Sequence, residues 1–429
     1  MTEKIPAQHR KTLASWALYD IASSTYGAVV PAGLLPLYFT SVVAEGRPDA
    51  QALWGGLAGI SVLMAGMVAP FAGALADGRR THAAVLAAFS LLCCLATALL
   101  PLAGRGEILQ AAALFIVAQV SFTVAIAIYD AYVERLGNLW GGAEKLSSFG
   151  WALGFLGGIA ALSVAIGMSS PNVSGGQASG LIDSFPWVAL LFALLAIPAC
   201  RGLRRVPAAP VSEAERHPLL RPLETLRAWR SHRRTMRFLL GAYLINDAIV
   251  TVLFFTGIYL RDIFGLSVTH LLWLAMAYHV IALPATALFG ILAHRTSAGT
   301  ALLATLGFWV AAIGVMAFGQ GLPAAVLVVA LLATVMGSTQ ALLRGMYARL
   351  VPPGQAAEFF GFNAFAGRLS AAVGPALFGA LSAAAGTPKA GLLSLLLFLV
   401  AGAVVLAGVR EPESAVGGEP QADSILAEG

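Results

Sequence analysis

Charged residues are scarce in this chain. Only 11% of its 429 residues are Asp, Glu, Lys or Arg, whereas 59% are hydrophobic. A soluble domain has about 25% charged residues, and one core could not bury this much apolar surface. The composition therefore excludes a soluble globular protein and predicts a protein whose surface is solvated by a bilayer.

Cysteines and catalytic motifs are also scarce. The three cysteines, Cys93, Cys94 and Cys200, lie in apolar runs, and the adjacent pair cannot form a relaxed disulfide. We expect all three to be core thiols. The sequence has no Walker loop, nucleophile triad or metal-ligand spacing. We therefore expect no enzyme activity, no cofactor and no metal site. The amino end has no cleavage-type sequence, so we expect it to be retained.

Long apolar runs dominate the rest of the chain. A membrane-spanning helix needs about 20 apolar residues, and twelve runs qualify, in two sets of six. They cover residues 14–42, 52–76, 82–103, 108–132, 146–168, 185–200, 237–260, 268–293, 299–319, 323–343, 357–384 and 390–409.

These runs predict an all-α membrane protein with two pseudo-symmetric six-helix bundles. The expected domains are a cytoplasmic amino end (1–13), a first bundle (14–200), a basic central loop (201–236), a second bundle (237–409) and an acidic, disordered cytoplasmic tail (410–429).

Positive charge lies mostly on one side of the predicted bundles, as expected for cytoplasmic segments. The central loop alone holds nine arginines, whereas the opposite connections hold only Arg47, Arg105, Arg261 and Lys389. We therefore expect both termini to be cytoplasmic in a bacterial inner (plasma) membrane. The net charge of +5 then reflects this topology and contact with anionic lipid headgroups. We expect membrane lipids and no nucleic acid as partners, and we expect a monomer.

Several motifs carry a family resemblance. Gly73-Ala-Leu-Ala-Asp77, followed by Arg79 and Arg80, is similar to the signature between the second and third helices of the major facilitator superfamily. Within that superfamily, three further segments resemble the vacuole-effluxer-like branch, which includes a fungal vacuolar amino acid exporter. They are Trp16 to Ser24, Ser148 to Gly158 and Gln340 to Pro375. The resemblance implies the twelve-helix major facilitator fold and a secondary transporter.

Five ionisable residues lie inside the predicted spans: Asp20, Asp130, Asp247, His279 and Arg368. A charge in hydrocarbon costs at least about 2.5–3.5 kcal/mol and persists only beside a partner or a water-filled cavity. Such residues therefore indicate a transport pathway.

The first predicted span offers Asp20, with Ser24 one turn further on the same face. Asp20 could exchange a proton or hold a substrate amine, and a fixed ion pair is the alternative. The neighbouring side chains Tyr19, Ser23 and Tyr26 are candidates for substrate contact, with aromatic packing as the alternative for the tyrosines.

The second bundle offers Asn246, Asp247 and Thr251 in the matching seventh span. His279 and Arg368 could converge on this region, although a lone helical histidine is more often a neutral hydrogen-bonding group. Arg368 either pairs permanently with Asp247 or receives a substrate carboxylate. The predicted substrate and proton pathway is completed by Tyr129, Asp130, Trp151 and Asn363, with a charge cluster at the helix end as the alternative for Tyr129 and Asp130.

A second group of residues is expected to act in gating. Gly73 allows close approach of a neighbouring helix, and Asp77 would then lie against the positive amino-terminal end of helix eleven, near Gln355 to Glu358. This contact would hold the cytoplasmic side closed. The remaining predicted gating residues are Arg79, Arg80, Arg135 and Arg344.

The sequence thus predicts a secondary active transporter that moves a small polar solute, with amino acids first, by rocker-switch alternating access. Protons are the candidate coupling ion. Drug or sugar-like efflux is the alternative within transport. A non-transporting membrane sensor or assembly partner on a transporter scaffold is the alternative of another class, for which an appended folded domain would be expected.

Overall fold

A computed structural model describes residues 7–27, 30–31, 35–45, 47–168, 177–206, 220–260, 264–266 and 268–409. Helices and short turns account for these residues, and none of them forms a strand. The predicted acidic tail (410–429) lies outside the described residues.

Twelve long helices follow one another along the described chain. The first half contains α1 (Ala7–Gly27), α3 (Ala50–Arg79), α4 (His82–Leu99), α5 (Ile108–Leu136), α6 (Ala143–Met168) and α8 (Gln177–Leu203). The second half contains α10 (Arg233–Ile258), α11 (Val268–Arg295), α12 (Ala298–Phe318), α13 (Gly321–Ala348), α14 (Ala356–Ala385) and α15 (Pro388–Ala407). Two short helices, α2 (Leu35–Tyr38) and α9 (Arg221–Arg227), lie between them.

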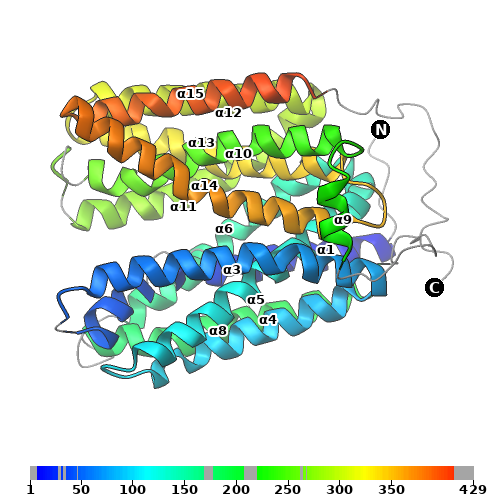
Figure 1. Cartoon of the computed structure of the whole chain (residues 1–429), viewed down its shortest axis with the longest axis horizontal. Coiled ribbons are helices and arrows are strands. Elements are labelled where there is room, and N and C mark those ends of the chain that lie inside the picture. Colours follow the sequence, from blue (N-terminus) through cyan, green and yellow to red (C-terminus); the bar gives the residue numbers. More distant parts are fainter. Residues whose placement is uncertain are drawn as a thin grey trace.

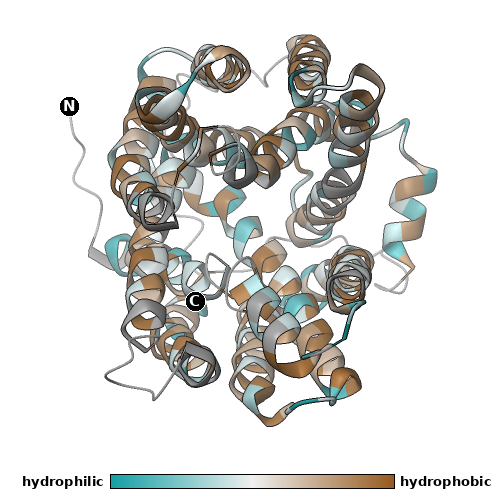
Figure 2. Cartoon of the chain, turned by 90° about the vertical axis from the view of Figure 1, so that its left-hand side faces the viewer, coloured by the Kyte–Doolittle hydropathy of each residue, from teal (hydrophilic) through white to brown (hydrophobic). Residues whose placement is uncertain are grey.

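The apolar helices show that the chain is an integral membrane protein. Ten helices within the described residues are long and apolar enough to span a bilayer: α3, α4, α5, α6, α8, α10, α11, α12, α13 and α15. Many large apolar side chains are exposed to the outside, for example Leu109, Leu288 and Leu397 at 83%, 62% and 71%. Figure 2 is a view along the helices and shows hydrophobic residues on helices throughout the molecule. The count of twelve spans stays a prediction.

Several predicted boundaries differ from the structure, and two of the differences bear on the domain limits. The span predicted at 14–42 is divided, because α1 starts at Ala7 and ends at Gly27, and α2 and a π-helical turn (Phe39–Val43) follow. Pro31 and Pro36 lie in this region, and proline has no N–H for the helix ladder. The central loop predicted at 201–236 includes the end of α8, all of α9 and the start of α10. Arginine is a good helix former, so helices continue past the apolar runs.

The two halves meet along pairs of helices. Figure 1 shows α3, α4, α5 and α8 on one side and α10, α12, α13 and α15 on the other. Between them, α3 packs against α14, and α6 packs against α11 and α13. Small residues allow these close approaches. A Cβ at Gly73 would collide with the backbone oxygen of Ala357, and one at Gly361 would collide with the backbone of Pro70.

Candidate functional site

Arg344 is the centre of a buried charge cluster between the halves. This α13 side chain belongs to the second half, and its ionic partners belong to the first. Its Nη1 lies 2.9 Å from Oδ1 of Asp130 on α5, and its Nη2 lies 3.2 Å from Oδ2 of Asp20 on α1. It also donates to the hydroxyl of Ser147 (2.7 Å) and to the Ser147 carbonyl (2.9 Å) on α6. Arg344 therefore connects three helices of the opposite half.

Aromatic rings enclose the same guanidinium. Its carbon lies 5.3 Å from the ring centroid of Trp16, 5.7 Å from Tyr129 and 5.9 Å from Trp151. These distances are within the range of cation–π attraction. The Tyr129 hydroxyl donates to Oδ2 of Asp20 at 2.9 Å. The rings fix the guanidinium and exclude water from its faces.

The cluster has one cation for two carboxylates. The three charged side chains are only 7–14% exposed, so each has lost most of its hydration. Removing one member of a buried ion pair costs about 3–5 kcal/mol because the remaining charge is uncompensated. The cluster is thus an electrostatic connection between the halves whose strength depends on every member remaining charged.

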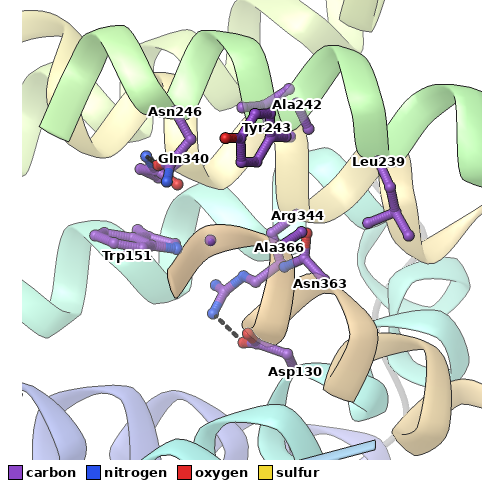
Figure 3. Close-up of a pocket in the computed structure, with 12 residues that line it drawn as sticks. Asp130, Trp151, Leu239, Ala242, Tyr243, Asn246, Gln340, Arg344, Asn363 and Ala366 are labelled. Carbon is purple, nitrogen blue, oxygen red and sulfur yellow. Dashed lines mark hydrogen bonds and ion pairs between the residues drawn. The ribbon is translucent and has the colours of Figure 1, made fainter. Parts of the chain in front are cut away.

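A cavity begins at this cluster and extends between the halves. Figure 3 shows Arg344 and Asp130 joined at its wall, with Trp151, Asn246, Gln340, Tyr243 and Asn363 around the same space. Gln340 donates to the Asn246 side chain at 2.7 Å. The indole Nε1 of Trp151 is buried and has no hydrogen-bond partner among the described residues. The cavity therefore offers a cation, a carboxylate, amides and an indole donor to a small polar molecule.

The predicted residues of the first span do not line this cavity. Tyr19 is fully buried, packs on Tyr129 with ring centroids 4.8 Å apart, and shares a 2.6 Å hydrogen bond with Ser90. Tyr26 packs against Phe122. Ser23 donates to the Asp20 carbonyl, and Ser24 faces Gly154 of α6. Asp20 itself is turned toward Arg344, so its ion pair, left open by the sequence, is present.

Asp247 occupies a separate buried site within the second half. It is fully buried on α10, and its Oδ1 accepts the Gly374 backbone N–H of α14 at 2.9 Å. Its Oδ2 has no hydrogen-bond partner within the described part of the chain. Thr251, one turn on, donates to the Asp247 carbonyl. Pro375 follows Gly374 in α14 and interrupts its helix ladder.

The predicted convergence of His279 and Arg368 on Asp247 is only partly described. The His279 ring contacts Phe155 of α6 and Tyr278, with centroids 5.9 and 5.3 Å apart. Asp247 is not among these ring contacts of His279 in the described part of the chain. The backbone of Arg368 belongs to α14, but its side chain lies outside the described part of the structure. Both readings of Arg368 therefore stay predictions.

A second buried cluster joins the halves at the α9 end of the bundle (Figure 1). Asp77, at the end of α3, accepts the backbone N–H groups of Ala357 (3.2 Å) and Glu358 (2.9 Å) at the start of α14. Its Oδ1 also lies 2.7 Å from Nε2 of His82. The predicted contact of Asp77 with the start of α14 is therefore present. Its role in gating stays a prediction.

Helix α9 inserts an arginine into this second cluster. Nη2 of Arg221 lies 3.5 Å from Oδ2 of Asp77, and its Nε donates to Oε2 of Glu358. The Thr225 hydroxyl donates to the other Glu358 oxygen at 2.6 Å. One residue of the central loop thus bridges a carboxylate of each half.

The remaining predicted gating residues surround this end of the bundle. Arg79 and Arg80 are exposed, and no ion pair involves either of them among the described residues. Arg135 lies 3.7 Å from Glu134. Arg80 and Arg135 line a basic cavity together with Arg204 and His82. No group of residues suited to a metal ion occurs in the described part of the chain.

Sequence reasoning missed several members of these clusters. Gln340 lies four residues before Arg344, and Tyr243 lies three before Asn246, so helical spacing places each pair on one face. That signal could have added Gln340 and Tyr243 to the site. Trp16 lies four residues before Asp20 and Ser147 four before Trp151, so the same spacing could have added them too. Arg221 has no such signal, because its partners Asp77 and Glu358 are distant in sequence.

Comparisons with known proteins identify the family. The model of the vacuole effluxer Atg22-like family matches residues 51–417. The MFS-type transporter YxiO of Bacillus subtilis (strain 168) is 28% identical over 448 residues, covering 96% of this chain and 98% of YxiO.

Solved structures share the fold. The human organic anion transporter MFSD10 superposes with a TM-score of 0.71 at 17% identity, covering 94% of this chain and all of that one. FucP, an MFS transporter in the outward conformation, superposes with a TM-score of 0.71 at 13% identity, covering 96% and 100%. The protein described here therefore belongs to the vacuole effluxer Atg22-like family of major facilitator superfamily transporters and is not an enzyme.

Proposed function

We propose that this transporter is secondary active and moves a small polar solute by alternating access. An amino acid is the first candidate for this solute. The solute binds in the cavity beside Arg344. The observation that carries the proposal is that Arg344 of one half is held by Asp20 and Asp130 of the other, and that Arg344 and Asp130 line that cavity. Alternating access takes place between such halves, around a site at their interface.

An amino acid matches the charges of the cluster. Its carboxylate can replace an aspartate on Arg344, since guanidinium and carboxylate bind each other in a bidentate way. Its ammonium group can pair with the aspartate that is released. The exchange keeps two carboxylates on Arg344 and adds an ion pair between the solute ammonium and the released aspartate, while one partner of Arg344 changes from the other half to a mobile solute. Binding would thereby replace a direct ion pair between the halves by a connection that runs through the solute.

Protons are the proposed coupling ion, with Asp20 and Asp247 as carriers. Asp20 reaches Arg344 only as a carboxylate, so protonation would release that ion pair. Asp247 has one oxygen without a described partner, and a proton there would remove the cost of a buried charge. FucP, which shares the fold, is a fucose:proton symporter.

The conformation is proposed to be closed at the cytoplasmic side. The Asp77 and Glu358 contacts join the halves at the α9 end, where both residues are at most 1% exposed. The arginines of the central loop favour a cytoplasmic location for this end. We further propose twelve spans, both termini in the cytoplasm, a bacterial inner membrane and a monomer.

Purified protein in liposomes tests the proposal. A panel of amino acids, sugars and organic anions is first screened for thermal stabilisation of the protein, and each hit is then tested for uptake with and without a pH gradient. We expect an amino acid to stabilise the wild type, and Arg344→Gln to abolish both stabilisation and uptake. Absence of flux for every compound would overturn the transport mechanism proposed here.

A sugar-like solute is the second candidate. The amides of Asn246, Gln340 and Asn363 and the indole of Trp151 are groups that bind hydroxyls and sugar faces. If the solute is sugar-like, we expect a neutral polyol to stabilise the protein, and this stabilisation should survive Arg344→Lys. If the solute is an amino acid, stabilisation by the amino acid should be lost in Arg344→Lys.

A further inference from the structure

Helix α9 has two faces with different surroundings. Arg221, Pro222 and Thr225 are buried against the ends of α3 and α14. Away from these contacts, the segment exposes four large apolar side chains at intervals of three residues, two of them on α9, one just before it and one just after it. Leu220, Leu223, Leu226 and Trp229 are exposed by 52%, 44%, 49% and 50%. An exposed apolar row of this kind indicates a surface that binds a partner or a membrane.

Positive charge accompanies the exposed row. Arg227, Arg230, Arg233 and Arg234 are all exposed. Glu224 is the single acidic residue between Arg221 and Arg234. The Arg230 guanidinium lies 5.6 Å from the Trp229 ring centroid. The surface combines leucines, a tryptophan and arginines, which is the composition of helices that lie in a membrane interface.

The position of α9 fits this composition. In Figure 1 it runs across the ends of the long helices rather than along them. Because those helices span the bilayer, α9 runs parallel to the membrane plane at the level where the apolar spans end. Tryptophan prefers that level, and arginines there meet lipid phosphates.

We infer that the face formed by Leu220, Leu223, Leu226 and Trp229, with its exposed arginines, docks on anionic lipid headgroups. Docking holds α9 in place, and Arg221 and Thr225 on the other face then hold Asp77 and Glu358 together. Anionic lipid would therefore stabilise closure of the α9 end. The docking of α9 on lipid does not depend on the proposed function. The effect of docking on closure of the α9 end rests on the proposed function.

Lipid contact is tested with a bimane label on Ala228→Cys, an exposed position outside the apolar row. The native cysteines are buried. Full-length protein is placed in vesicles of brominated phosphatidylcholine, alone or with an equal part of brominated phosphatidylglycerol. We expect stronger quenching with the anionic lipid. Arg227→Gln with Arg230→Gln should abolish the difference.

Arg105→Gln is the matched control, because Arg105 is also exposed but pairs with Glu45 at another part of the surface. It should leave the difference unchanged. A probe that stays unquenched in both vesicles would overturn the inference and indicate a protein partner. Equal quenching in both vesicles would overturn the role of the arginines.

Coupling to the gate is tested by hydrogen exchange of the first turns of α14. We expect slower exchange in the anionic vesicles. Thr225→Val removes the hydrogen bond to Glu358 and should abolish this protection while bimane quenching persists. Equal exchange of the wild type in both vesicles would overturn the coupling. Neither measurement requires a solute, so failure of the transport proposal is detected separately.

Discussion

At the scale of single residues, Arg344 is the central residue of the candidate site. It is bound by two carboxylates, two oxygens of Ser147 and three aromatic rings. Arginine suits this place because its planar guanidinium offers five donors and remains charged. Lysine would provide the charge but could not reach both aspartates with fixed geometry.

Removing the Arg344 charge should destabilise the protein. Arg344→Gln leaves Asp20 and Asp130 facing each other without a cation, and we expect a loss of about 3–5 kcal/mol. Adding Asp130→Asn removes one of the two carboxylates and should restore part of the stability without restoring uptake. Thermal unfolding in detergent and uptake into liposomes measure the two effects. A single variant as stable as the wild type would contradict the role of the cluster.

Asp247 allows a cleaner separation of structure from proton transfer. Asp247→Asn preserves an acceptor for the Gly374 N–H, so we expect near-native thermal stability together with loss of uptake driven by a pH gradient. Asp247→Ala removes the acceptor and should cost about 1–3 kcal/mol more. Solute counterflow, which needs no proton gradient, should survive in the Asn variant. Unchanged proton-driven uptake in that variant would exclude Asp247 as a carrier.

At the scale of elements, the crossing of α3 and α14 determines how closely the halves approach at the α9 end. Gly73 lies against the Ala357 carbonyl, and Gly361 lies against Pro70. Neither helix has a flexible side chain at these contacts, so the backbone itself must move if a side chain is added.

Gly73→Ala should therefore separate α3 from α14 and open the α9 end. Gly59→Ala on the same helix is the matched control, because nothing lies within 4 Å of its Cβ position. A cysteine replacing the fully buried Ala356 reports the opening through its reaction rate with a polar maleimide. We expect faster labelling for Gly73→Ala and an unchanged rate for Gly59→Ala. Equal rates would show that the crossing tolerates a methyl group.

The contact of Asp77 with α14 was predictable, because a helix amino terminus attracts a carboxylate and the motif identifies the helix end. The ion pair of Asp20 with Arg344 was not, since the two residues are 324 positions apart. Arg221 and Arg227 lie on one short basic segment and differ only in the face of α9 that they occupy. The sequence therefore predicts the helices and many of the charged groups, whereas their partners depend on tertiary packing.

At the scale of the whole molecule, the expected orientation in the membrane has a direct test. A green fluorescent protein fused after Gly429 should fluoresce in bacteria, and alkaline phosphatase fused there should be inactive, if the carboxyl end is cytoplasmic. Fusions at Gly106, between α4 and α5, should give the reverse result. Fluorescence at both positions would contradict the predicted topology.

The ratio of charges around Arg344 also has an electrical consequence. With all three groups ionised, one guanidinium and two carboxylates have a formal charge of −1. A zwitterion leaves this charge unchanged, whereas a proton cancels it. If the cluster moves through the membrane field, one direction of the cycle transfers charge and the other does not. Membrane voltage, at about 2.3 kcal/mol per charge and 100 mV, would then drive the empty and loaded transporter to different extents.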